Sequence, residues 1–121
     1  MITTDWEGVQ RPTVCIDFDG VLNVYDGNYH AGPVHPPAPG VRQFLEALND
    51  RYLPVILTAR DTDEVWSWLI DNALEELVDN VTNEKPPAIA YIDDRAICFT
   101  GDFGATLAIL ECFQPHWEAR R

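Results

Sequence analysis

Two pairs of aspartates stand directly after apolar stretches of the sequence, and their side chains are the best placed in the chain for chemistry. Asp17 and Asp19 end the segment TVCIDFD, and Asp93 and Asp94 follow IAYI. Carboxylates this close repel one another and raise the pKa of one of them unless a cation lies between them. Mg²⁺ prefers oxygen ligands, usually one or two carboxylates with water and phosphate oxygens. One such pair could equally form a turn or cap a helix, but two pairs predict a magnesium site.

Three further residues have groups that can hold phosphate. Thr58 ends the run LPVILT, where its hydroxyl and the backbone N–H of Ala59 can donate hydrogen bonds to phosphate oxygens. Lys85 is the only lysine in the chain, and two prolines follow it and stiffen its loop. Its ammonium group could neutralise phosphate and an attacking carboxylate. Taken alone, Thr58 could be an ordinary strand residue and Lys85 an ordinary surface residue.

Other side chains near these positions have two open interpretations. Arg60 and Arg95 could each bind a second anionic group of a substrate with two parallel hydrogen bonds, or pair with neighbouring acids. A loop rich in Gly and Pro, residues 23–39, carries aromatic and histidine side chains that are either solvated or in contact with substrate. These are Tyr25, Tyr29, His30 and His35.

The elements that must position these groups are short apolar runs and amphipathic stretches. Apolar runs predict buried strands at residues 13–18, 53–58 and 89–92, with a very short strand inside 80–88 and another at 96–99 as weaker candidates. Helical spacing of apolar residues predicts helices that begin near residues 40 and 62, the second after the capping residue Asp61 and with a break at 71–73. A closing helix is predicted at 103–113.

Strands that alternate with helices predict an α/β, three-layer Rossmann-like fold with a central parallel sheet covered on both faces. In such sheets, ligands bind outside the carboxyl ends of the strands, where all the candidate residues fall. The 121 residues fit a single domain over residues 1–121, with the chemistry-bearing core at about 13–113.

The composition of the chain argues against some classes of binding partner. The net charge of −12, from 20 acids against 8 bases, argues against long nucleic acid and anionic membranes. No apolar run approaches the ~20 residues needed to span a bilayer, and the first residues lack a signal-peptide pattern, so a cytoplasmic location is expected. The 3 cysteines, without CxxC spacing, predict buried free thiols.

The segments VCIDFDGVL and LTAR, then Lys85, then YIDD, occur in the order and spacing of the four motifs of the haloacid dehalogenase-like (HAD) superfamily. The resemblance runs over roughly residues 13–110. The stretch TNEKPPAIAYIDDRA is also similar to small superfamily members of phage and bacterial genomes, usually described only as hydrolase-like. The resemblance implies a HAD-type phosphatase, a magnesium-dependent phosphomonoesterase.

The resemblance also implies roles for individual residues. Asp17 would attack phosphorus and become a phospho-aspartate, while Asp19 would act as the acid and then the base. Thr58 and Lys85 would hold the transferring phosphoryl group. The Asp17 carboxylate, the Asp19 backbone carbonyl and an acid of the Asp93–Asp94 pair would bind Mg²⁺. An acid at position 19 favours phosphoryl transfer over carbon–halogen cleavage.

The gaps between the motifs are too short for an inserted cap domain, so the resemblance is to a capless member. Capless relatives act on large substrates or form oligomers that cover the site, which makes a homo-oligomer an expectation here. The acidic composition leaves phosphorylated small molecules and nucleotides open as substrates.

Three other functions are alternatives to a phosphatase. A magnesium- and phosphate-binding or regulatory module without turnover is the main alternative. A receiver-like phosphoacceptor domain has its lysine after all the acids, whereas here Asp93 and Asp94 follow Lys85. A P-loop kinase is disfavoured because the sequence has no GxxxxGK[ST] motif.

Overall fold

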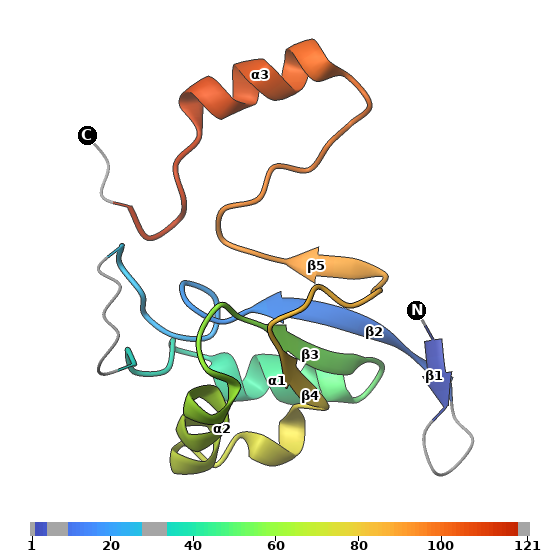
Figure 1. Ribbon diagram of the computed structural model, residues 1–121, viewed down its shortest axis with the longest axis vertical. Coiled ribbons are helices and arrows are strands. Elements are labelled where there is room, and N and C mark those ends of the chain that lie inside the picture. The colour runs from blue at the N-terminus through green and yellow to red at the C-terminus, as the bar shows by residue number, and fades with distance from the viewer. Residues whose placement is uncertain (1, 5–9, 28–33, 119–121) are drawn as a thin grey trace.

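The computed structural model of the chain describes residues 2–4, 10–27 and 34–118. Its centre is a parallel sheet in the order β5–β2–β3–β4 (Figure 1). These strands are β2 (Gln10–Asp17), β3 (Leu53–Leu57), β4 (Asn80–Thr82) and β5 (Ala90–Ile92). The strand β1 (Ile2–Thr4) pairs antiparallel with the beginning of β2. The predicted α/β, Rossmann-like fold with a parallel sheet is confirmed.

The register of the sheet aligns the carboxyl ends of its strands. Asp17 is opposite Leu57, Leu57 is opposite Thr82, and Ile16 is opposite Ile92. Residues that follow these positions therefore meet at one edge of the sheet. Side chains alternate between the two faces of a strand. Accordingly, Val14 and Ile16 of β2 belong to the hydrophobic core, while Cys15 and Asp17 line a cavity on the other face.

The helices begin where the sequence supplies start signals. The helix α1 (Val41–Asn49) follows Gly40, which has a left-handed φ of 83°. The helix α2 (Thr62–Asp71) is capped by Asp61, whose side chain accepts a hydrogen bond of 2.8 Å from the backbone N–H of Asp63. The predicted break after α2 is confirmed, because Ala73 has a positive φ of 55° and leads into the short helix η1 (Glu75–Leu77).

The core lies between the sheet and the helices α1 and α2. Phe18, at the end of β2, is fully buried and meets Trp68 of α2 edge to face, with ring centroids 4.9 Å apart. Leu45 of α1 and Ile56 of β3 are also fully buried in this cluster. The core thus fixes the ends of β2 and β3, which carry the candidate site.

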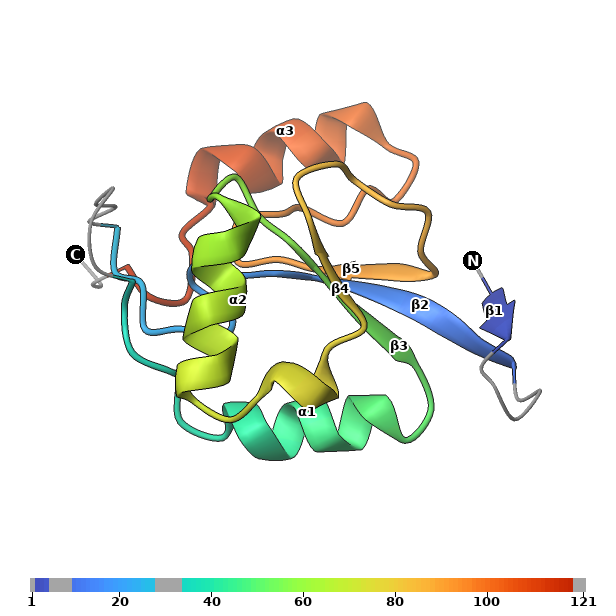
Figure 2. The same cartoon turned by 60° about the horizontal axis from the view of Figure 1, so that its bottom comes forward.

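The last helix, α3 (Phe103–Cys112), lies on the opposite side of the sheet from α1 (Figure 2). None of its residues is buried, and Phe103, Leu107 and Leu110 are 78%, 62% and 59% exposed. The helix α3 therefore lies on the side of the sheet where a third layer is expected, but it does not cover that face, since its apolar side chains stay exposed. None of the described helices has the length and apolar character to cross a membrane.

Two smaller expectations are wrong. Residues 96–99 form no strand, because this segment leads away from the sheet toward α3 (Figure 1). Cys15 is a buried free thiol as predicted, but Cys98 and Cys112 are exposed. Both exposed cysteines lie on the segment that ends in α3, so they share its lack of cover.

Candidate metal and phosphate site

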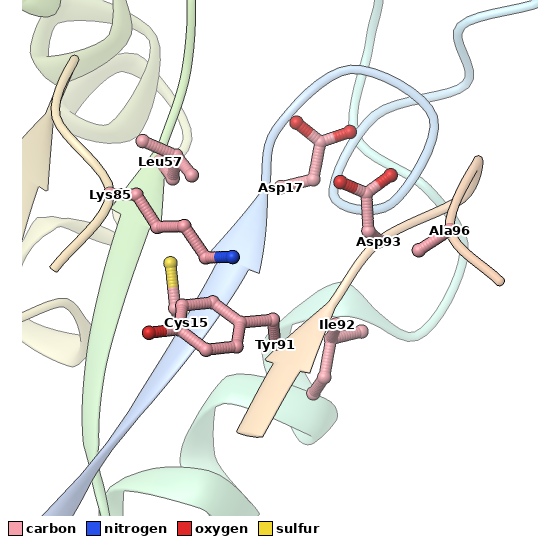
Figure 3. Close-up of a pocket in the computed structure, with 8 residues that line it drawn as sticks. All are labelled: Cys15, Asp17, Leu57, Lys85, Tyr91, Ile92, Asp93 and Ala96. Carbon is pink, nitrogen blue, oxygen red and sulfur yellow. The ribbon is translucent and has the colours of Figure 1, made fainter. Parts of the chain in front are cut away.

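Three carboxylates converge at the carboxyl edge of the sheet. Asp17 ends β2, and Asp93 and Asp94 follow β5, the neighbour of β2. Figure 3 shows Asp17 and Asp93 side by side. One oxygen from each carboxylate lies within 4.8 Å of the others. Asp94 is buried and Asp93 is exposed, so the cluster opens to solvent on one side. The sheet therefore brings together three of the four acids that the sequence singles out.

The electrostatics of this cluster favour a bound cation. Burial first, then a hydrogen bond shared with Asp94 and the charges of Asp93 and Asp94, raise the pKa of Asp17 to about 8. Burial acts against ionisation of Asp94 as well, but hydrogen bonds with Trp117 and Asp17 outweigh it and lower the pKa of Asp94. Without a cation, the two carboxylates therefore compete for one proton.

The free oxygens of the cluster fit a hard cation. When both carboxylates are ionised, Asp17 Oδ2 and Asp94 Oδ1 are buried and have no hydrogen-bond donor within the described part of the chain. Buried polar atoms normally have partners, so each of these is an unfilled position. Magnesium takes carboxylate oxygens together with water and phosphate oxygens. The donor set of Asp17, Asp93 and Asp94 has this chemistry.

The fourth acid, Asp19, is held apart from the cluster by its own partners. The guanidinium of Arg60 contacts both of its oxygens, through Nε at 2.8 Å and Nη2 at 3.1 Å. Asn23 donates a further hydrogen bond of 2.9 Å to Oδ1. This three-point grip fixes the orientation of the Asp19 carboxylate, which borders the same cavity as Asp17.

Two cavities adjoin Asp17. One, of about 270 Å³, is bounded by Asp17, Asp19, Thr58 and Ala59. The other, of about 230 Å³, lies over Cys15 and is bounded by Asp17, Asp93 and Lys85 (Figure 3). Asp17 is therefore accessible from both sides.

The residues predicted to hold phosphate surround these cavities. Thr58 is buried, and its Oγ1 accepts a hydrogen bond of 3.0 Å from the backbone N–H of Arg60, which leaves its hydroxyl hydrogen available to an anion. Lys85 is exposed, and its Nζ lies 4.5 Å from the centroid of the Tyr91 ring. That cation–π contact holds the ammonium group over the face of the sheet that carries Asp17.

The two arginines differ in their surroundings. The side chain of Arg60 is only 1% exposed and pairs with Asp19 and with Glu64, the latter at 2.7 Å. Arg95 is 53% exposed, lies 3.7 Å from Asp94 Oδ2 and faces the Tyr25 ring at 5.8 Å from its centroid. Both arginines line the cavity of about 270 Å³ beside Asp17, but Arg60 is buried in two ion pairs, whereas about half of the Arg95 side chain is exposed. Tyr29 and His30 lie outside the described residues.

Two buried or bridging asparagines organise the loops, and the sequence analysis missed both. Asn23 is 2% exposed, and its Oδ1 accepts hydrogen bonds from the backbone N–H groups of Gly20 and Tyr25 at 3.0 and 3.1 Å. Asn83 donates to the carbonyls of Thr58 and Arg60 at 2.7 and 2.8 Å. Asn83 therefore ties the loop of Lys85 to that of Thr58. Their proximity to the motifs was the only signal in the sequence.

The C-terminal segment also reaches this site, although its sequence carries no readable signal. Trp117 donates from its indole Nε1 to Asp94 Oδ2, and its ring meets Tyr25 edge to face at a centroid distance of 5.1 Å. These contacts join residues far apart in the chain, so no local sequence pattern could have revealed them.

Comparison with models of known protein families, with curated proteins and with solved structures gave no match. The features that bear on function are therefore those of the chain itself. They are a parallel α/β sheet, an acidic cluster at its carboxyl edge, and two cavities that share Asp17.

Proposed function

We propose that the protein is a magnesium-dependent phosphomonoesterase of the HAD-like type, with Asp17 as its nucleophile. The observation that carries the proposal is the acidic cluster, in which oxygens of Asp17, Asp93 and Asp94 lie within 4.8 Å of one another. The unpaired, buried Oδ2 of Asp17 lies within it, and cavities lined by Thr58 and Lys85 adjoin it.

Asp17, Asp93 and Asp94 would hold the cation. When bound, Mg²⁺ supplies positive charge against the negative charge that builds on the phosphoryl oxygens, and it favours ionisation of Asp17. The raised pKa of Asp17 makes this second effect important. A protonated carboxyl group is a poor nucleophile, whereas the ionised group can attack phosphorus.

Two carboxylates of this chain, those of Asp17 and Asp19, would then carry out the reaction. An oxygen of Asp17 attacks phosphorus, the bond from phosphorus to the ester oxygen breaks, and Asp19 gives its proton to the departing alcohol. Asp19 next takes a proton from water, whose oxygen attacks the phospho-aspartate and releases phosphate and Asp17. Arg60 and Asn23 hold the Asp19 carboxylate in place for both steps.

The remaining residues would hold the phosphoryl group and the rest of the substrate. Thr58, the backbone N–H of Ala59 and the ammonium group of Lys85 bind phosphoryl oxygens, which lowers the barrier as charge develops there. Arg95 and Tyr25 border the same cavity and would meet the leaving group.

The proposal extends to partners and location. The cavity of about 270 Å³ suits a phosphorylated small molecule or a nucleotide rather than a polymer. A second copy of the chain is the partner proposed for the uncovered α3, whose exposed apolar side chains are typical of an interface. The cytoplasm, where phosphorylated metabolites and Mg²⁺ are abundant, is the proposed location.

A screen of phosphorylated metabolites and nucleotides tests the proposal. We expect release of phosphate from at least one monoester with Mg²⁺, no release with EDTA, and loss of at least ~10³-fold in kcat for Asp17→Asn. Asp71→Asn, an exposed acid at the end of α2, serves as the matched control and should retain full activity. A folded protein that binds Mg²⁺ but turns over no substrate would instead favour a phosphate-binding or regulatory module.

A further inference from the structure

After α3, the chain returns to the candidate site. Residues 113–118 run from the end of α3 back toward the loop that follows β2 (Figure 1). Nε2 of His116 hydrogen-bonds to the carbonyl oxygen of Gly20 at 2.6 Å. The next residue, Trp117, donates its indole N–H to Asp94 Oδ2 and packs edge to face on Tyr25. Two consecutive side chains thus hold the segment on the site.

The loop after β2 is shaped to receive the indole. Gly20 and Gly27 both have a positive φ, 90° and 99°, which favours glycine. A Cβ at Gly20 would lie 2.9 Å from Trp117 Nε1 and would also collide with the Asp94 carboxylate. A Cβ at Gly27 would lie 2.9 Å from Trp117 Cζ3. Side chains are therefore missing at the two positions where the ring needs the space.

The two oxygens of Asp94 consequently have different surroundings. Oδ2 accepts the indole hydrogen bond and lies near Arg95, while Oδ1 is buried and has no partner in the described part of the chain. Rotation of the carboxylate would break the indole hydrogen bond. The indole is a donor only, so it can hold Asp94 without competing for the cation.

We infer that Trp117 is a positioning residue for the metal site, which orients Asp94 so that Oδ1 joins the Asp17 carboxylate in binding a divalent cation. This inference rests on the magnesium site of the proposed function. Groups that hydrogen-bond to a ligating carboxylate fix its orientation, and their loss typically costs 10- to 100-fold in metal affinity. The C-terminal segment also lies against one side of the site, through His116 and Trp117.

Calorimetric titration of the full chain with MgCl₂, in the absence of substrate, tests the inference. Trp117→Phe removes the N–H and part of the ring. Replacement of Trp117 by 3-benzothienylalanine keeps the shape of the indole and removes only the N–H. Trp66→Phe changes a partly buried tryptophan that packs against the core and is the matched control.

Both changes at position 117 should weaken Mg²⁺ binding about 10- to 100-fold, while Trp66→Phe leaves the affinity unchanged. Without metal, both position-117 variants should still melt cooperatively, at a lower temperature than the wild type, because the buried Asp94 carboxylate loses a hydrogen-bond donor. In the wild type and in Trp66→Phe, the tryptophan fluorescence should change on Mg²⁺ addition, and in Trp117→Phe this change should be lost.

The outcomes separate the two hypotheses. Unchanged affinity in both position-117 variants, with Mg²⁺ binding intact in the wild type, overturns the role of Trp117 and leaves the proposed function standing. Weaker binding in Trp117→Phe but not in the benzothienyl variant overturns orientation by the hydrogen bond. A wild-type protein that binds no Mg²⁺ overturns both the inference and the proposed function.

Discussion

Replacement of Asp17 by Asn should abolish turnover and, at the same time, stabilise the metal-free protein. Asp17 has a pKa of about 8 in the folded state, against an ordinary value of 3.8. At pH 7 the unfolded chain carries an ionised Asp17, so folding must take up a proton there. The free-energy cost of that uptake is at most about 4 kcal/mol. Asn has no charge to neutralise, and its amide N–H can occupy the place of the shared proton.

The net gain is smaller than this limit, because Asp94 benefits from the shared proton. The hydrogen bonds of Asp94 with Trp117 and Asp17 lower the pKa of Asp94, and this stabilisation offsets part of the free-energy cost of proton uptake at Asp17. We expect Asp17→Asn to raise the free energy of unfolding by about 2 kcal/mol at pH 7 in EDTA. For a domain of this size, that corresponds to a rise of about 8 °C in melting temperature.

The sign of the pH dependence follows from the direction of the shift. The folded-state pKa of Asp17 is the higher one, so the folded protein keeps a proton that the unfolded chain releases. The stability of the wild type relative to Asp17→Asn therefore falls as pH rises from about 4 to about 8. Near pH 4 the two proteins should have nearly equal stability.

Urea denaturation of both proteins at pH 4.5, 6 and 7.5 measures this difference, first in EDTA and then with saturating MgCl₂. Magnesium should stabilise the wild type more than the variant, because binding to the folded state adds to its stability. Asp71→Asn again serves as control and should show no such pH dependence. An Asp17→Asn protein that is no more stable than the wild type at pH 7.5 in EDTA would refute the reasoning.

Three further predictions concern other parts of the site. Arg60→Met should lower the free energy of unfolding by about 3 kcal/mol in urea denaturation, because Asp19 and Glu64 lose the buried cation with which they pair. A loss under 1 kcal/mol would contradict this. Lys85→Met should change stability by less than about 0.5 kcal/mol but lower kcat/KM about 100-fold in a phosphatase assay, and equal activity would remove Lys85 from the site. A thiol reagent should modify Cys98 and Cys112 in the native protein but Cys15 only after denaturation. Burial and then the nearby charge of Asp17 raise the pKa of the Cys15 thiol, which keeps it unreactive. Three fast-reacting thiols would contradict the fold.

The strands and helices near the site were predictable because each has a local signature. Consecutive apolar residues at 13–18 and 53–58 marked strands buried on both faces, and they became β2 and β3. The carboxyl ends of parallel strands share one edge, so these two strands, together with the one predicted at 89–92, were enough to bring Asp17, Thr58 and Asp93 to a common place.

The exposure of α3 was not predictable from its own residues. Its sequence, FGATLAILEC, is apolar on all sides, which normally indicates a buried helix. Yet Phe103, Leu107 and Leu110 are exposed, and the nearby cysteines are exposed with them. An apolar helix surface favours burial, but the sequence does not show whether the same chain or another one packs against it.

The roles of Arg60 and Trp117 depend on contacts that no local pattern encodes. From the sequence, Arg60 could bind a substrate or pair with one of many acids, and its contact with Asp19, 41 residues away, is visible only in the folded chain. Trp117 lies 23 residues from Asp94 and had no motif around it. Both side chains hydrogen-bond to carboxylates of the candidate site. The motifs thus identify the groups that would react, while the residues that orient those groups emerge only from the folded chain.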